Sequence, residues 1–207
     1  MYVARILYPV KTLGPGDRVG IWFSGCVNRC AMCISPELWE QPERFRISAP
    51  GLMKIVSHIS DQHHIDGFTL SGGEPFYQPD ALRELLPALS RISQDILIYS
   101  GYLYEDLSRD YQDILAQIAV LVDGPYIEEQ NHQKVLKGSD NQRVIVLKPE
   151  YQKTYDAYCR MEHSAVQNFT TATGVASVGI HKPGFQEILE QKLKKKGLIR
   201  NHGDEPR

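Results

Sequence analysis

The sequence predicts an α/β protein, an open, incomplete parallel β/α barrel followed by a small C-terminal α/β extension. Two observations support this fold class. Short apolar segments alternate with segments whose apolar residues recur at helical spacing, an order typical of a parallel sheet with right-handed crossovers. The chain has 207 residues, whereas a full eightfold barrel usually takes ~250, so we expect the barrel to be incomplete.

Five short apolar segments are the predicted strands of the core, and three amphipathic segments between them are the predicted helices. The strands are expected at residues 19–23, 67–70, 96–99, 119–122 and 143–147. The helices are expected at residues 50–60, 81–92 and 107–115. In the first helix, Leu52, Ile55, Val56 and Ile59 fall on one stripe, the pattern of a helix that covers a sheet.

A polar turn that contains glycine follows each of the first four predicted strands. In parallel sheets, the loops after the carboxyl ends of the strands build the binding site, so we expect these turns to meet along one rim. The turns are Gly25 with the cysteines beyond it, Gly72-Gly73-Glu74, Ser100-Gly101 and Asp123-Gly124.

The pattern changes near residue 149. We therefore expect a core over residues 1–149 and a C-terminal extension over residues 150–207. The extension is predicted to form a helix over residues 151–163, a strand over 174–180 and a second helix over 185–196. A frayed tail is expected over residues 201–207.

Composition argues against several functional classes. A net charge of −2 gives no general reason to bind nucleic acid or an anionic membrane. No apolar run approaches the ~20 residues of a membrane helix, and the first residues lack the pattern of a signal peptide. Four cysteines, three of them clustered, do not resemble a disulfide framework, so a cytoplasmic location is expected.

Three cysteines carry most of the functional information. Cys26, Cys30 and Cys33 form a C-x3-C-x2-C motif in the loop over residues 24–36. Three thiolates can hold one face of a metal cluster, but they cannot complete a closed, all-cysteine iron–sulfur or zinc site. The position left open is where chemistry can occur. The spacing therefore favours a [4Fe–4S] cluster in which one iron lacks a cysteine.

A zinc site is the alternative. Cys159 and His163 lie four residues apart on a predicted helix, so either one could complete a site with the three clustered cysteines. Structural zinc usually takes paired C-x2-C motifs, which makes this interpretation weaker. A non-catalytic zinc or iron–sulfur binding module nevertheless stays open as a functional class. His181 is more simply explained as a structural histidine, although it could face the open site.

The turn Gly72-Gly73-Glu74-Pro75 has a simple explanation as a link between strand and helix. Because the turn follows the cysteine loop in the chain, a role in ligand binding is a second explanation. Two glycines allow the backbone to come close to a ligand, and Glu74 can accept a hydrogen bond from an ammonium group.

Taken together, these motifs resemble the radical S-adenosylmethionine (SAM) superfamily. Gly14-Pro15-Gly16 with Arg18 resembles the approach to the cysteine motif in the glycyl-radical-activating branch of that superfamily. Residues 99–102, 121–126 and 138–143 are similar to segments of the activators of anaerobic ribonucleotide reductases. The similarity follows the family order from residue 8 to residue 147.

The resemblance implies a partial barrel of the radical SAM type and a division of roles among the site residues. Cys26, Cys30 and Cys33 would ligate the cluster, and its open iron would bind the amino and carboxylate groups of SAM. The turn over residues 72–74 would bind the methionine amino group. No catalytic residue beyond the cluster is implied.

Three further residues are assigned to the cofactor through the resemblance. Ser100 lies where the family often places a polar contact to SAM. Asp123, at the end of the next strand, would hold SAM, a cation or the rim itself. Met32 takes the usually aromatic position near adenine, where it offers a softer apolar surface.

The implied activity is that of an enzyme that reductively cleaves SAM to a 5′-deoxyadenosyl radical and generates a glycyl radical in a partner enzyme. An anaerobic ribonucleotide reductase is a candidate partner, and a flavodoxin or ferredoxin is the expected electron donor. An incomplete barrel agrees with this activity, because it leaves a mouth wide enough for a protein loop. A second hypothesis keeps the radical chemistry but modifies a peptide or small metabolite, with residues 150–207 as a cap.

Overall fold

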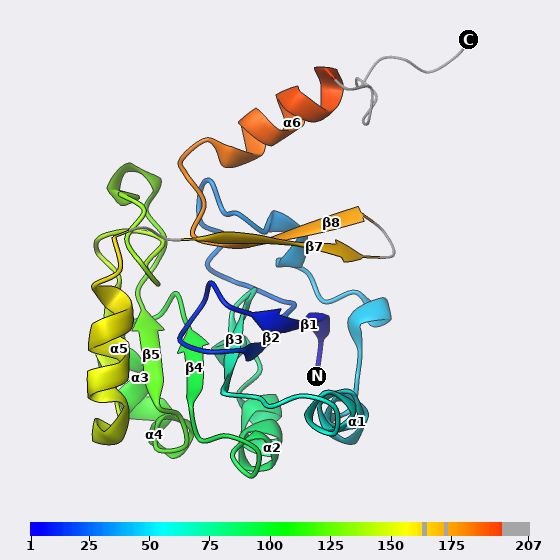
Figure 1. Cartoon of the computed structure of the whole chain (residues 1–207), viewed down its shortest axis with the longest axis vertical. Helices are drawn as coiled ribbons and strands as arrows, with labels where there is room; N and C mark the ends of the chain where they lie inside the picture. The colour runs from blue at the N-terminus through cyan, green and yellow to red at the C-terminus, as the bar shows by residue number, and fades with distance from the viewer. Residues whose placement is uncertain (163–164, 172–173, 196–207) are drawn as a thin grey trace.

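The computed structural model describes residues 1–162, 165–171 and 174–195, and its centre is a six-stranded mixed sheet (Figure 1). Neighbouring strands follow the order β1-β2-β3-β4-β5-β6. Strands β2 to β5 are parallel, whereas β1 and β6 pair antiparallel at the two edges. The strands are β1 (Val3–Val10), β2 (Arg18–Phe23), β3 (Gly67–Gly72), β4 (Ile96–Tyr99), β5 (Val120–Asp123) and β6 (Arg143–Val146).

The prediction of an α/β protein with a largely parallel sheet is confirmed, but the expectation of a wholly parallel sheet is wrong at its edges. Over the described residues the sheet stays open, because β1 and β6 end it without pairing to each other. The chain between β5 and β6 contains only a short 3-10 turn, Glu128–Gln130, in its first half. With no crossover helix, the chain returns antiparallel to β5.

Helices cover both faces of the sheet. The apolar sides of α1 (Ala49–Ser60), α2 (Pro79–Leu89), α3 (Tyr104–Asp110) and α4 (Gln112–Leu115) pack with β2 to β5 into the main core. On the opposite face, Tyr155 of α5 (Gln152–Cys159) packs in a second cluster with residues of β4 and β5. Alternate residues of β4 and β5 therefore face different clusters, which explains why the apolar run of each of these strands does not alternate with polar residues.

The rest of the extension is a hairpin followed by a helix. The predicted strand at 174–180 is β8 (Gly174–Gly179), and it pairs antiparallel with β7 (Val166–Thr171), which the sequence did not predict. Helix α6 (Phe185–Lys195) follows. Figure 1 shows the hairpin lying beyond the end toward which β4 points. The predicted tail at 201–207 lies outside the described residues.

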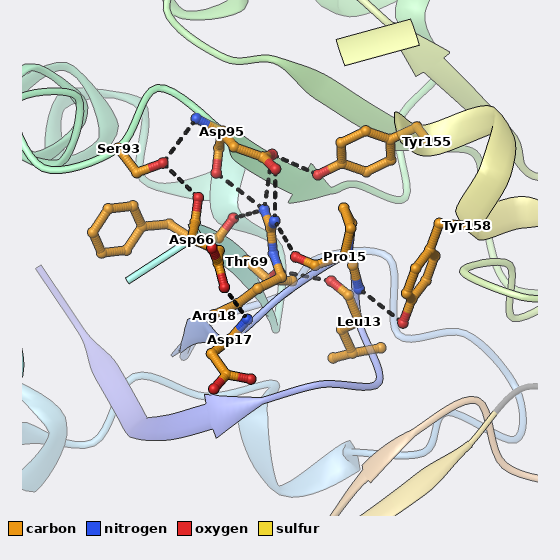
Figure 2. A network of polar contacts seen from close by, with 12 residues as sticks. Leu13, Pro15, Asp17, Arg18, Asp66, Thr69, Ser93, Asp95, Tyr155 and Tyr158 are labelled. Atoms are coloured by element: carbon orange, nitrogen blue, oxygen red, sulfur yellow. Dashed lines mark hydrogen bonds and ion pairs between the residues drawn. The ribbon is translucent and has the colours of Figure 1, made fainter. Parts of the chain in front are cut away.

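A buried polar network ties α5 to the core (Figure 2). Arg18, at the start of β2, has no exposed surface, and its Nη1 lies 2.9 Å from Asp95 Oδ2. Its Nε donates to Thr69 Oγ1 at 2.7 Å. The hydroxyl of Tyr155 donates to the other carboxylate oxygen of Asp95 at 2.6 Å. Because the desolvated charges satisfy one another, this network fixes α5, the first helix beyond residue 149, against the sheet.

Candidate functional site

A cavity of about 600 Å³ lies at the carboxyl edge of the parallel strands. All of the predicted site residues except Asp123 line it. Those residues are Cys26, Cys30, Met32, Cys33, Gly72, Gly73, Glu74 and Ser100. The turns expected to meet at one rim therefore do meet, with the exception of the Asp123 side chain.

The cysteine loop leaves the end of β2 and is fixed at its start by backbone hydrogen bonds. The amides of Gly25 and Cys26 donate to the carbonyls of Leu38 and Trp39 at 2.7 and 2.9 Å. Farther along, Arg29 and Met32 adopt left-handed backbone conformations, with φ of 39° and 59°. These bends fold the loop so that all three cysteines line the same cavity.

The three thiols of the loop are the candidate ligands of an iron–sulfur cluster. Over the described residues, no group of three His, Cys, Asp or Glu side chains is placed to hold a metal ion. In a [4Fe–4S] cluster each thiolate binds a different iron, so the sulfur atoms lie farther apart than around one ion. The cysteines form no disulfide, and burial raises the pKa of Cys26 and Cys33, an effect that bound iron would reverse. Three half-buried thiols around one cavity therefore fit a [4Fe–4S] group.

Gly72 and Gly73 are required by contacts with the protein backbone. Gly72 has a φ of 108°, and a Cβ there would lie 2.4 Å from the carbonyl oxygen of Phe23. A Cβ on Gly73 would lie 2.4 Å from the carbonyl oxygen of Gly25. The amides of Gly73 and Glu74 donate to those same carbonyls at 2.8 Å. This turn thus holds the first residues of the cysteine loop in place.

Glu74 links three loops of the rim. Its Oε1 accepts from the Ser100 hydroxyl and the Phe76 amide, both at 3.0 Å. Its Oε2 accepts from the Gly101 amide at 2.7 Å and from Asn28 Nδ2 at 3.4 Å. The residue is 1% exposed, and this burial raises the pKa of its carboxyl to about 7 despite the hydrogen bonds. A cation that enters the cavity would therefore favour the ionised form of the Glu74 carboxyl.

Asn28 is a site residue that the sequence reasoning missed. It lies inside the C-x3-C spacing, contacts Glu74 and lines the cavity. Its polar amide between two metal-ligand candidates was the available signal.

Asp123 is fully buried and stabilises the rim. Its carboxylate accepts the backbone amide of Tyr104 at 2.8 Å and pairs with the guanidinium of Arg143, whose Nε lies 3.0 Å away. Arg143 also binds the carboxylate of Glu105 at 2.7 and 2.9 Å. These contacts favour the rim among the roles that the sequence left open, while contact with a cofactor stays a prediction.

Cys159 lies away from the three clustered cysteines. It is exposed at the end of α5 and lines a different cavity of about 500 Å³, which none of the other three cysteines lines. This arrangement offers no support for Cys159 as a fourth ligand. His163, the other candidate, lies outside the described residues.

The C-terminal extension contributes a wall of the cavity that the sequence did not predict in detail. Residues 175–182 of β8 and the loop beyond it line the cavity, together with several residues of α6. His181 is 8% exposed, and its Nε2 lies 2.8 Å from Ser177 Oγ. The backbone carbonyl of His181 accepts from Asn131 Nδ2 at 2.9 Å, which joins this wall to the loop after β5.

An open α/β sheet that presents a three-cysteine loop at its carboxyl edge defines a class of iron–sulfur protein. The chain belongs to the family of 4Fe-4S single cluster domains, whose model matches residues 12–145. Among the helices of the described residues, none combines the length and the apolar character of a membrane span.

Particular relatives refine this assignment. The chain is 31% identical over 144 residues to the anaerobic ribonucleoside-triphosphate reductase-activating protein of Enterobacteria phage T4, covering 67% of this chain and 90% of that protein. It is 33% identical over 130 residues to the protein of the same name from Vibrio cholerae, covering 59% and 83%. The pyruvate formate-lyase-activating enzyme of Clostridium pasteurianum is 28% identical over 123 residues, covering 58% and 50%. The predicted resemblance to the glycyl-radical-activating branch is confirmed.

Proposed function

We propose that this protein is a radical SAM activase that generates a glycyl radical in a partner enzyme. The observation that carries the proposal is a single cavity lined by three cysteines, the 72–74 turn and Ser100. When bound, a reduced [4Fe–4S] cluster and SAM supply a one-electron cleavage of SAM and the removal of a hydrogen atom from glycine. The relatives whose names specify reductase activation support this activity.

The residues of this chain bind and orient the two cofactors. Cys26, Cys30 and Cys33 would ligate the cluster, with one iron left for SAM. The Gly72-Gly73 backbone fixes the cysteine loop, and Glu74 receives the methionine amino group. Ionised Glu74 favours a cationic ligand, because its carboxylate is buried without an opposite charge among its hydrogen-bond partners.

The finer assignments follow from the same proposal. Ser100 orients Glu74 through their 3.0 Å hydrogen bond, Met32 faces the adenine, and Asp123 supports the rim. The open sheet corresponds to the incomplete barrel of radical SAM enzymes. Residues 1–149 form the radical SAM core, and residues 150–207 form an extension whose first helix is fixed to that core.

The partner is a glycyl radical enzyme, with an anaerobic ribonucleotide reductase as the first candidate. Relatives named for such a reductase support this choice over the pyruvate formate-lyase type, because they match over most of their own length. A flavodoxin or ferredoxin is the proposed electron donor, since one-electron reduction of the cluster needs a low-potential protein.

Electron paramagnetic resonance on a mixture of reduced protein, SAM and a purified anaerobic ribonucleotide reductase tests the proposal. The expected result is a stable organic radical on the reductase. The matched control replaces the activase with the Cys30→Ser variant, which should give no radical. SAM cleavage without a radical on any glycyl radical enzyme would defeat the activase function.

One observation favours a second candidate. The extension lines the cavity, and a cavity enclosed by an additional wall suits a small metabolite or a short peptide better than a folded partner. In that case SAM cleavage should accelerate when the metabolite or peptide is added, and glycyl radical enzymes should stay without a radical.

A further inference from the structure

The wall contributed by the C-terminal extension lies outside the part of the chain that the family model matches. That match ends at residue 145, whereas the wall begins at Val175. The wall nevertheless faces the same cavity as the three cysteines. Residues 12–145 therefore build only part of the cavity, and the wall from the extension is available to bind a ligand there.

Three hydrogen bonds fix this wall to the core. Thr12 Oγ1 donates to the carbonyl of Val178 at 3.1 Å in a buried position. Asn131 Nδ2 donates to the carbonyl of His181 at 2.9 Å, also buried. The amide of Gly184 donates to Glu128 Oε1 at 3.1 Å. Val178 is itself 4% exposed and packs in an apolar cluster with Trp22 and its neighbours. The wall is thus built into the fold on two sides of the cavity.

The wall carries an aromatic pair. The rings of His181 and Phe185 have centroids 4.1 Å apart and are tilted by 43°. Both residues line the cavity, and Ser177 Oγ holds the His181 ring through Nε2. Burial lowers the pKa of His181, so the ring is neutral at neutral pH and does not repel a cationic ligand.

This chemistry suits a purine. Nucleic-acid bases stack on aromatic side chains with ~1–3 kcal/mol per base, whichever base is involved. The core side of the cavity offers thiols, the buried carboxyl of Glu74 and backbone amides, which suit the polar methionine end of SAM. The aromatic surface of the extension is the complementary feature for the nucleoside end.

We propose that His181 and Phe185 hold the adenine ring of SAM, so that the C-terminal extension completes the cofactor site. This inference rests on the proposed function. It assigns the extension to cofactor binding, whereas recognition of the partner is left to other surfaces.

The test measures SAM binding directly, without turnover. Full-length protein is reconstituted anaerobically, its iron and sulfide are counted, and the Kd for labelled SAM is measured by equilibrium dialysis. The variants are His181→Leu and Phe185→Leu, which keep apolar bulk but remove the aromatic face, and His181→Phe, which restores it. His64→Ala is the matched control, because His64 is exposed and does not line the cavity.

Each leucine variant should raise the Kd about tenfold, which corresponds to ~1.4 kcal/mol, with iron and sulfide unchanged. His181→Phe and His64→Ala should stay within about twofold of the wild type. A Kd that is unchanged in both leucine variants overturns the inference. So does loss of iron in His181→Leu, which would mark His181 as an iron ligand. If wild-type protein with a full cluster does not bind SAM, the proposed function itself fails.

Discussion

The buried carboxyl of Glu74 makes stability depend on pH in a way that can be isolated. Burial raises its pKa from the ordinary 4.5 to about 7. Between these values the folded protein binds a proton that the unfolded chain has released. The free energy of unfolding contributed by this group is therefore fully present below pH 4.5 and is lost as the pH rises toward 7.

The size of the effect follows from the gap of about 2.5 between the two pKa values, 7 − 4.5. At about 1.4 kcal/mol for each unit of pKa, the loss approaches ~3 kcal/mol as an upper estimate. The slope is at most about 1.4 kcal/mol per pH unit, because one proton is involved.

Urea denaturation of the cluster-free full-length chain at several pH values between 5 and 8 measures this effect, with Glu74→Gln as the perturbation. Subtracting the variant from the wild type removes the contributions of other titrating groups. The difference should fall steadily from pH 5 to pH 6.5 and level off above pH 7. Glu84→Gln, an exposed position on α2, is the matched control and should follow the wild type. Parallel profiles for the wild type and Glu74→Gln would refute the reasoning.

Three further predictions concern the cluster, the turn and the network. Cys30→Ser should abolish cluster assembly in an iron and sulfide assay. Cys159→Ser should keep about four irons per chain, because Cys159 lines another cavity. Iron loss in Cys159→Ser would contradict this prediction. Gly72→Ala should unfold the chain or lower its Tm by more than ~5 °C. The alanine Cβ would lie 2.4 Å from a backbone oxygen, and the backbone φ of 108° is unfavourable for alanine. A melting curve like that of the wild type would count against this contact. Tyr155→Phe should cost ~1–2 kcal/mol in urea denaturation, because Asp95 loses a buried donor at 2.6 Å; an unchanged midpoint would argue against the network.

Much of the core could be predicted from sequence, because its strands are buried on both faces. Strands β2 to β5 contain short, mainly apolar runs, and the helices between them have clear apolar stripes. Each strand is followed by a turn with glycine, so the rim and its cysteines could be placed as well.

The edge strands of the sheet and the hairpin were harder to predict, because their sequences show only a weak alternation of apolar and polar residues. Strand β1 is only partly buried and contains Pro9, and β7 alternates between exposed and half-buried positions with mostly polar residues. The direction of β6 depends on how the chain returns from β5, which no local pattern reveals.

The side-chain partners at the rim could not be predicted, since they come from loops that are distant in sequence. The contact of Glu74 with Ser100 spans 26 positions, and that of Asp123 with Arg143 spans 20. The sequence identified Gly72 and Gly73 as positions of close approach, but only the fold reveals that the approaching atoms are backbone oxygens of Phe23 and Gly25.

The electron paramagnetic resonance spectrum of the reduced cluster, recorded with and without SAM, tests the central claim most directly. If three cysteines leave one iron open, added SAM binds that iron and changes the spectrum. An identical spectrum in the presence of saturating SAM would mean that the protein itself ligates every iron, and it would contradict the account.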